Sequence, residues 1–284
     1  MNVQLMTDGG ADIPQKLMNT LDIKIVPLYL HFKDGQYKTG ELDMTSFFNK
    51  IKETNELPRS AAPSPHDFYE AYKSVDPERP ILMLSLTKGL SSTYENAVTA
   101  KNMLLEDEPN RKIEVINTKT ASCGIALLMY ESSKKLAENY TFEQLVEHLK
   151  ERVEQTTTLF VLKTLENLIL GGRLDKVRGA IAKTLNVKLI MKASEDKGDI
   201  EVIEKVRGDK KAVRRFIELI GEHTKNAEGK VIAMTHCVDE KRAQTVLDEI
   251  NQTYPFADSL LSETGPLIST YGGEGALVIS FFNN

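Results

Sequence analysis

Three consecutive hydroxyl side chains, Ser91, Ser92 and Thr93, stand in "TKGLSSTYENA", which follows the strand-like run "ILMLSL". A strand that leads into a helix N-terminus can hold an anion, because free backbone amides and the helix dipole point to the same place. Ser92 and Glu95 match the S-x-x-E capping box, which predicts that Ser92 caps the helix. Ser91 then has no capping role, and we expect it at the carboxyl end of a parallel strand, where open α/β sheets bind ligands.

A second group of hydroxyls occurs in "PRSAAPSPHDF". Ser64 precedes Pro65 and has Asp67 three positions on, so it is predicted to cap the next helix. This assignment leaves Ser60 as the hydroxyl without a structural role.

Other chemical motifs are absent or ambiguous. The chain contains no GxGxxG after its first strand-like run, no GxxxxGK[ST], no HExxH and no GxSxG. "YGGEGA" at 271–276 could offer amides to a phosphate, although a turn is the more common use of such a glycine cluster. Cys123 lies near an expected helix start, where either thiolate chemistry or simple packing is conceivable and packing is favoured. Sequence alone pairs none of the five histidines with a catalytic acid or nucleophile.

Composition excludes several classes of function. The 284 residues are 41% hydrophobic and 27% charged with a formal net charge of −5, so no basic surface suited to nucleic acid is expected. Two cysteines, Cys123 and Cys237, provide neither a CxxC nor a zinc spacing, and we expect no metal. The start "MNVQLMTDGGAD" lacks the apolar centre of a signal peptide and no run reaches membrane-spanning length, which predicts a cytoplasmic protein.

Short apolar runs alternate with amphipathic stretches in the first half of the chain, which predicts an α/β fold with a mostly parallel sheet and flanking helices. The runs are "VQLMT", "IKIVPLYL", "ILMLSL" and "KIEVIN", and helix caps are predicted at Asp12, Asp43, Ser64 and Thr141. Helices are expected at about 120–139 and at 142–153.

The second half predicts a mixed-sheet α/β domain, and we place the division at 1–157 and 158–284. Helices are expected around Leu165, through "VRGAIAKTL" at 177–185, and in "KKAVRRFIELIGEHT" and "EKRAQTVLDEI". The strands expected there are "VKLIMKA" and "IEVIEKV", joined across "SEDKGD", followed by "KVIAMTH" and "GALVISFF".

Six segments together resemble the motifs of the DegV proteins, the fatty-acid-binding subunits of bacterial fatty acid kinase. "TDGGADIP" resembles T-D-S-x-A-D-[LI], "RSAAPS" resembles T-S-Q-P-S, and "LSSTYENA" resembles L-S-G-T-Y-Q-S-A. "VINTKTASCG", "LENLILGGRLDK" and "GPLISTYGGEGALVI" resemble V-x-D-S-x-x-x-S-x-G, L-x-x-L-x-x-G-G-R-I and G-P-V-I-x-x-H-x-G-P-G-A-L. The resemblance extends over essentially the full length, with the segments in the family's order.

The resemblance implies a two-domain protein that encloses a long-chain fatty acid in a tunnel and presents its carboxylate to a separate kinase subunit, which forms the acyl phosphate from ATP. It implies that the chain itself is not an enzyme, needs no cofactor, and has at most peripheral or transient membrane contact. By the same resemblance Ser60 and Ser91 would hold the carboxylate, and Ser92, Arg173 and Tyr271 would support them.

Departures from the family pattern concern the same region. Ala61 and Ala62 replace S-Q, Ser92 replaces the glycine of L-S-G-T, and Tyr271 replaces the histidine. Asn117-Thr118 stands at the D-S pair. A tyrosine can donate one hydrogen bond but cannot be cationic at neutral pH. The alternative hypothesis is an enzyme that acts on a small phosphorylated or carboxylated substrate, with Ser91, Arg173 and the "GGEG" turn as its anion site.

Overall fold

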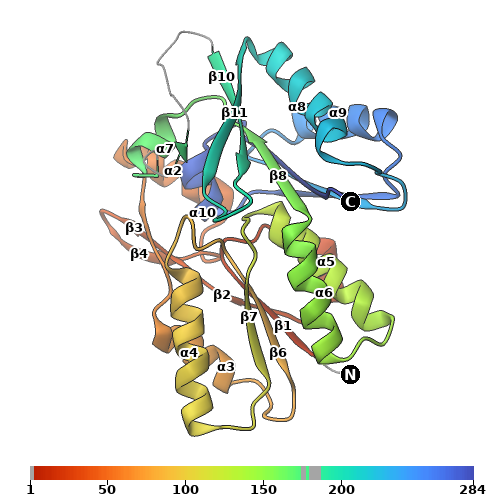
Figure 1. Ribbon diagram of the computed structural model, residues 1–284. Helices are drawn as coiled ribbons and strands as arrows, with labels where there is room; N and C mark the ends of the chain where they lie inside the picture. Colours follow the sequence, from red (N-terminus) through yellow and green to blue (C-terminus); the bar gives the residue numbers. More distant parts are fainter. Residues whose placement is uncertain (1–2, 174–176, 179–186) are drawn as a thin grey trace.

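The computed structural model describes residues 3–173, 177–178 and 187–284. A four-stranded sheet occupies the lower half of the molecule and a seven-stranded sheet the upper half, with a small three-stranded sheet at the side (Figure 1). The expected α/β class, with a parallel sheet followed by a mixed sheet, is confirmed.

The four-stranded sheet has the order β2-β1-β6-β7, and all of its strands are parallel. Every residue of β1 and β6 is buried, because helices cover both faces of the sheet. Helices α3 and α4 pack on one face through Phe68, Tyr72 and Ala97, and α5 and α6 pack on the other. The elements are β1 (Gln4–Asp8), β2 (Ile23–Val26), β6 (Ile81–Ser85), β7 (Ile113–Asn117), α3 (Pro65–Lys73), α4 (Thr93–Asp107), α5 (Cys123–Ala137) and α6 (Phe142–Glu154).

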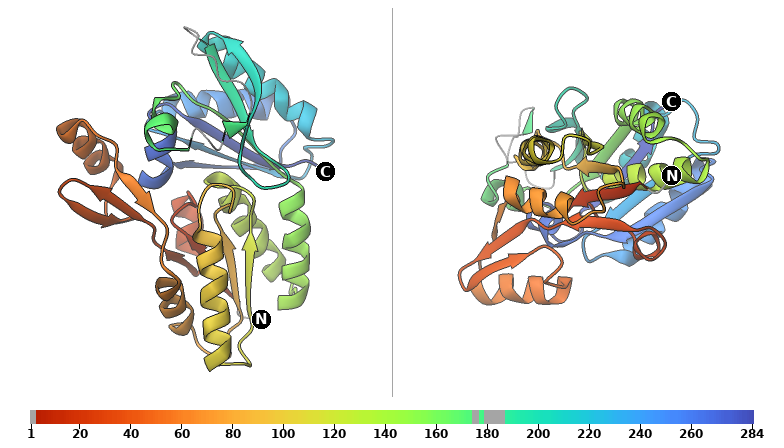
Figure 2. Two further views of the ribbon diagram at one scale, coloured as in Figure 1. Left: turned by 60° about the vertical axis from the view of Figure 1, so that its left-hand side comes forward. Right: turned by 90° about the horizontal axis from the view of Figure 1, so that it is seen from below.

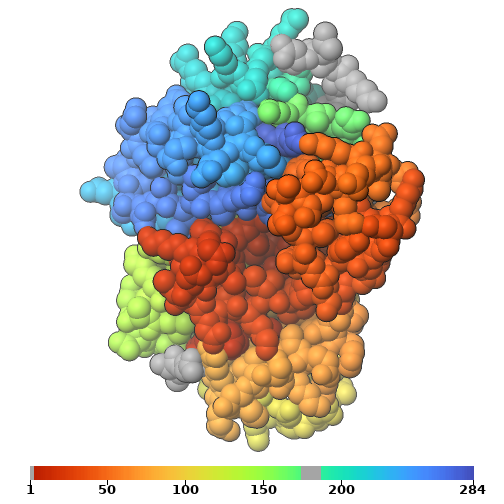
Figure 3. Space-filling model, turned by 180° about the vertical axis from the view of Figure 1, so that it is seen from behind, coloured from red at the N-terminus to blue at the C-terminus, as the bar shows by residue number. Residues whose placement is uncertain are grey.

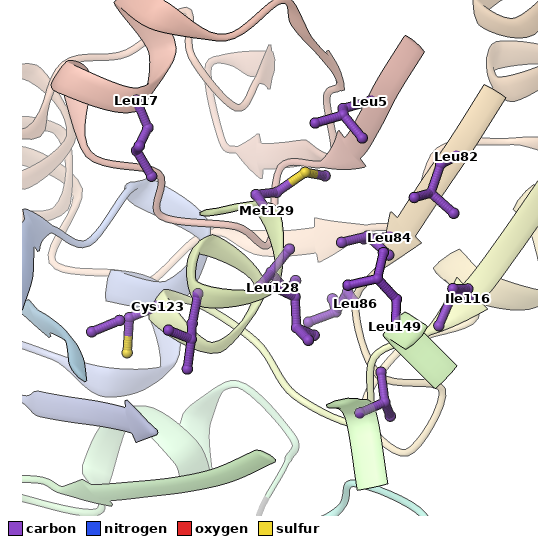
Figure 4. Packing of buried hydrophobic residues seen from close by; sticks show 14 of the residues in the cluster. Leu5, Leu17, Leu82, Leu84, Leu86, Ile116, Cys123, Leu128, Met129 and Leu149 are labelled. Carbon is purple, nitrogen blue, oxygen red and sulfur yellow. The ribbon is translucent and has the colours of Figure 1, made fainter. Parts of the chain in front are cut away.

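Helix α5 lies between the two large sheets and is buried on all sides along its first two turns. Leu128 and Met129 contact the parallel sheet near Leu5 and Leu84, as Figure 4 shows. The Sγ atom of Cys123 lies 3.5 Å from the carbonyl oxygen of Val278 in the other sheet. This helix therefore joins the two halves into one continuous core.

The seven-stranded sheet has the order β13-β12-β14-β8-β10-β11-β9, in which β12 pairs parallel with β13 and β11 pairs parallel with β9. Helices α8 and α9 cover its outer face. Along the chain, the first strand of this sheet is β8, which starts at Thr156. The proposed domain division at 157/158 stays a prediction. The elements are β8 (Thr156–Val161), β9 (Val177–Arg178), β10 (Val187–Ala193), β11 (Ile200–Arg207), β12 (Val231–His236), β13 (Asp258–Glu263), β14 (Leu277–Phe282), α8 (Asp209–His223) and α9 (Glu240–Thr253).

The three-stranded sheet β4-β3-β5 projects from the side of the molecule together with helix α2, as Figure 2 shows in its left view. From behind, this segment lies beside the seven-stranded half (Figure 3). No helix among the described residues is both long and apolar enough to cross a membrane. The remaining elements are β3 (Tyr29–Phe32), β4 (Gly35–Lys38), β5 (Arg59–Ala61), α1 (Gln15–Thr20), α2 (Met44–Thr54), α7 (Glu166–Leu170) and α10 (Pro266–Gly272).

Three of the predicted helix caps are confirmed, those of Asp43, Ser64 and Thr141. The cap predicted at Asp12 is wrong, because Pro14 occupies the cap position and Asp12 is turned into the core. The run "IKIVPLYL" is divided at Pro27 into β2 and β3, which belong to different sheets. Proline has no N–H for a ladder hydrogen bond, so it suits a point where the chain leaves one sheet for another.

The helix predicted at 177–185 is wrong at its start, where Val177–Arg178 forms β9 beside β11. Residues 179–186 lie outside the described residues. The other helices and strands predicted for the second half are confirmed, and the hairpin of β10 and β11 is antiparallel across 194–199. Strand β13 and helix α10 were not predicted, although α10 carries Tyr271.

Candidate functional site

A largely apolar cavity lies at the carboxyl ends of β6 and β7, between the parallel sheet and the mixed sheet. This is the edge at which open α/β sheets bind ligands. The cavity has a volume of about 130 Å³, roughly tenfold what one water requires. Its apolar lining comes mainly from the loop after β6, from β8 and α7, and from α10: Leu28, Leu86, Leu90, Phe160, Leu162, Leu168, Ile200, Leu267, Ile268 and Val278.

The β6–α4 loop brings Ser91 to this cavity, as the sequence predicts. Contrary to the sequence analysis, the Ser91 hydroxyl also bonds to the first residue of α4. The Thr93 N–H donates to Ser91 Oγ at 3.3 Å, and the two hydroxyls are hydrogen bonded at 2.7 Å. Ser92 occupies the cap position but makes no side-chain cap bond, so the predicted capping box with Glu95 is wrong. The reason is its backbone: φ is −77° and ψ is 8°, whereas a capping side chain needs an extended residue. Ser92 is not among the lining residues.

Ser60, Tyr271 and Arg173 meet at the cavity from three separate elements. Ser60 belongs to β5 and its hydroxyl is hydrogen bonded to the Tyr271 hydroxyl of α10. The Arg173 guanidinium carbon lies 5.0 Å from the centre of the Tyr271 ring, in cation-π contact, and its Nη1 donates to the Gly171 carbonyl at 3.0 Å. A Cβ on Gly171 would approach the Tyr271 ring to 2.6 Å, so the glycine permits the ring to pack there.

Arg173 is the one cation among the described lining residues, and no carboxylate of the described chain forms an ion pair with it. The acidic residue that lines the cavity, Asp199, accepts a hydrogen bond from Ser194 Oγ. A cation without a paired carboxylate beside apolar surface favours an anionic ligand. The arrangement can therefore bind a carboxylate or a similar anion whose remainder is apolar.

Four lining threonine and serine residues were not predicted: Thr87, Thr120, Ser122 and Thr158. Thr87 follows β6, Thr120 and Ser122 follow β7, and Thr158 lies within β8. Thr120 and Thr158 are hydrogen bonded to each other at 2.7 Å, and Thr158 to Ser280 at 2.8 Å. For Thr87, Thr120 and Ser122 the sequence signal is position, since polar residues directly after buried parallel strands lie at the ligand-binding edge. Thr158 lies inside a strand of the mixed sheet and has no such signal.

Two buried carboxyl groups stand near the cavity but do not line it. Asp12 accepts hydrogen bonds from the Gly265 N–H (2.7 Å) and from Ser122 Oγ (2.5 Å), and burial raises its pKa to about 7. Asp8 accepts from the N–H groups of Gly10 and Leu86, and burial raises its pKa to about 6. Their donors belong to the chain itself, so both act in the fold rather than at an open site.

The weaker candidates of the sequence analysis do not contribute to the cavity as bases. No histidine is among the described lining residues, and His236 is buried at the end of β12, as expected for a strand end. Burial raises the pKa of the Cys123 thiol to about 12, which fits packing rather than thiolate chemistry. The glycine cluster forms the predicted turn, in which the N–H groups of Gly273 and Gly275 already donate to Ser269 and Cys237 carbonyls.

Comparison with known proteins shows which family this chain belongs to. The family model described as "Uncharacterised protein, DegV family" matches residues 2–284. A DegV domain-containing protein of Streptococcus pneumoniae is 32% identical over 286 residues, which cover 99% of each chain.

Solved structures with a similar fold agree with this family match. A DegV family protein of Ruminococcus gnavus, solved with vaccenic acid, is 27% identical with a TM-score of 0.91 over 99% of each chain. The fatty acid kinase B3 protein of S. pneumoniae, loaded with linoleic acid, is 31% identical with a TM-score of 0.87 over 100% of each chain. From the family match over almost its entire length, the chain belongs to the DegV family.

Proposed function

We propose that this protein binds one long-chain fatty acid in the cavity between its two large sheets, with the carboxylate at Ser60 and Ser91. The observation that carries the proposal is the combination of an apolar lining with Ser60, Ser91, Arg173 and Tyr271 on one cavity. Arg173 supplies the positive charge, and Tyr271 supplies a hydroxyl that can donate to a carboxylate oxygen.

Burial of the acyl chain supplies the affinity in this proposal. At about 0.8 kcal/mol for each methylene, a chain of sixteen carbons contributes on the order of 10 kcal/mol before ordering costs. The hydroxyls then need only orient the carboxylate, and no base is required. This agrees with the absence of histidine from the described lining residues.

We further propose that the protein is a non-catalytic partner in the cytoplasm, which presents the bound carboxylate to a separate ATP-binding kinase subunit. The related structure whose name includes fatty acid kinase B3 supports this assignment. Contact with a membrane would be peripheral and transient, at the stage when the acid is acquired.

Native mass spectrometry of the protein purified from bacteria tests the binding step. A copurified species with the mass of a fatty acid supports the proposal. A ligand-free protein that turns over a small phosphorylated or carboxylated substrate would overturn it and favour the enzyme alternative. ATP-dependent acyl phosphate formation, measured with the kinase subunit and with or without this protein, tests the presentation step.

A further inference from the structure

Helices α7 and α10 pack against each other beside the cavity, and each brings one head-group side chain to it. Arg173 follows the end of α7 by three residues, and Tyr271 lies in the last turn of α10. Gly171 and Gly172 separate Arg173 from α7, and Gly172 is exposed with a φ of +66°. Because a glycine backbone is conformationally free, the place of Arg173 over the Tyr271 ring depends on how α7 is held against α10.

Asn167 makes a direct hydrogen bond from α7 to α10. Its side-chain Nδ2 donates to the Thr270 carbonyl at 3.0 Å. Thr270 lies in the last turn of α10, where carbonyls have no N–H partner within the helix, so the amide satisfies one of them. The backbone carbonyl of Asn167 accepts from the Gly171 N–H at 2.8 Å. One residue thus contacts both the end of α10 and the start of the turn that leads to Arg173.

Glycines on two sides of Asn167 permit this close contact. Gly273 follows α10 with a φ of +69°, and a Cβ there would lie 3.2 Å from the carboxamide carbon and oxygen of Asn167. A Cβ on Gly171 would lie 2.9 Å from the Asn167 carbonyl oxygen and 2.6 Å from the Tyr271 ring. The Gly-Gly-Arg turn and the "GGEG" turn, about a hundred positions apart in the sequence, therefore meet at Asn167.

We propose that Asn167 is a positioning residue, whose amide holds α7 against the end of α10 and thereby keeps the Arg173 guanidinium over Tyr271, where it can meet the carboxylate of the acid. The inference rests on the proposed fatty acid function and deepens it, because it concerns recognition of the charge rather than of the acyl chain. Asn167 is not among the described lining residues, so it acts on the ligand through Arg173 and Tyr271.

Fluorescence titration with cis-parinaric acid and with its methyl ester tests the proposal. The two ligands share one acyl chain, but the ester has no negative charge for Arg173. Asn167→Leu keeps the approximate size of the side chain and removes the N–H donor, and leucine has the higher helix propensity. We expect about fivefold weaker binding of the acid and less than about twofold change for the ester. Equal losses for both ligands, or wild-type affinity for the acid, would overturn the proposal.

Gln4→Leu is the matched control. Gln4 is buried at the amino end of β1, away from the cavity, and its Nε2 donates to the Asp22 carbonyl at 2.9 Å. The variant loses a similar amide-to-carbonyl bond, yet it should bind the acid within about twofold of the wild type.

A double-variant cycle with Arg173→Leu shows whether Asn167 acts through the arginine. In the Arg173→Leu background, Asn167→Leu should weaken binding of the acid by less than about twofold, because the charge that Asn167 positions is already gone. Losses that multiply in the double variant would contradict the proposal.

NMR of the ligand-free protein separates this proposal from the proposed function. The Tyr271 ring shifts the resonances of the Arg173 side chain, since the guanidinium carbon lies 5.0 Å from the ring centre. Asn167→Leu should move these resonances toward those of an exposed arginine, as Tyr271→Leu does, and Gln4→Leu should leave them in place. Wild-type protein that binds no fatty acid contradicts the proposed function, whereas unchanged Arg173 resonances in Asn167→Leu contradict the role of Asn167.

Discussion

Two polar clusters lie between the large sheets, and they differ in how fully their hydrogen bonds are satisfied. The first, here called the buried seam, consists of Asp12, Ser122, Thr235, Thr120, Thr158 and Ser280. Its hydroxyls are buried and each has a partner within 2.8 Å. The second, the head-group cluster, consists of Ser60, Ser91, Tyr271 and Arg173, which are half-buried at the cavity.

The difference teaches that buried hydroxyls by themselves do not indicate a ligand site. In the buried seam the donors and acceptors satisfy one another, so the seam joins α5 to the mixed sheet and stabilises the fold. In the head-group cluster Arg173 has no paired carboxylate within the described chain, and a ligand can supply one. Changes in the seam should therefore reduce stability, whereas changes in the head-group cluster should reduce binding.

The largest effect is expected for Gly124→Ala, which places a methyl group against the buried seam. A Cβ there would overlap Thr120 Oγ1 and lie 2.9 Å from Thr158 Oγ1, so the hydroxyls must separate. Overpacking and broken bonds should cost about 3 kcal/mol of unfolding free energy, measured by urea denaturation. Gly221→Ala in α8 is the control and should change stability by at most about 1 kcal/mol, because the nearest neighbours of its Cβ belong to one side chain, Tyr254, whose hydroxyl oxygen would lie 3.0 Å away. Equal losses in both variants would contradict the special role of the seam.

Two buried carboxyl groups, Asp12 of the seam and Asp8, should make the unfolding free energy depend on pH. The folded pKa values of Asp12, about 7, and Asp8, about 6, lie above the ordinary value of 3.8. The folded state thus holds more protons, and these groups lower the unfolding free energy as the pH rises from about 4 to 7. Asp12→Asn should flatten this decline by about 2 kcal/mol between pH 5 and 7.5.

Thermal or urea unfolding at several pH values, wild type against Asp12→Asn, isolates this contribution. Other carboxyl groups have lowered pKa values and act in the opposite direction, so the difference between the two proteins is the relevant quantity. Parallel stability curves for the two proteins would show that Asp12 keeps an ordinary pKa.

Local sequence predicts most of the layers of this fold but little of its pairing between distant segments. The run "ILML" is apolar throughout because both faces of β6 are covered, and that pattern identifies a parallel strand. Ser64 and Asp67 cap α3 through atoms three residues apart, which the sequence displays directly. Strand β5 has three residues and its register depends on β3, about thirty positions earlier, so no local pattern indicates it.

The same distinction applies to the candidate site. Ser60 and Ser91 both line the cavity, and their role in binding a carboxylate stays a prediction. The capping argument that selected Ser91 was wrong, because it depended on the backbone angles of Ser92. The contact of Ser60 with Tyr271 joins residues 211 positions apart. Such a contact follows from how the small sheet packs on α10, which sequence spacing does not encode.

The head-group cluster should respond in binding rather than in stability. Ser60→Ala and Ser91→Ala each remove one hydroxyl that can donate to the carboxylate, and the double variant should bind a fatty acid about tenfold more weakly. Ser91→Ala also removes the bond to the Thr93 N–H, so a small stability loss of about 0.5–1 kcal/mol is expected for it. Titration with a fluorescent fatty acid measures the affinity. Wild-type affinity in the double variant would remove both residues from the site.

The smallest effect is expected for Tyr271→Phe, which separates the two contributions of this side chain. The ring that packs on Gly171 and beneath Arg173 is kept, and only the hydroxyl bonded to Ser60 is lost. Affinity should fall about threefold, because the lost bond is one of several to the carboxylate and the cation stays in place. Tyr271→Leu removes the ring as well and should weaken binding further, since Arg173 loses its stacking partner. If both variants bind equally, the ring does not position Arg173, and the head-group cluster resembles the buried seam more than a site prepared for an anion.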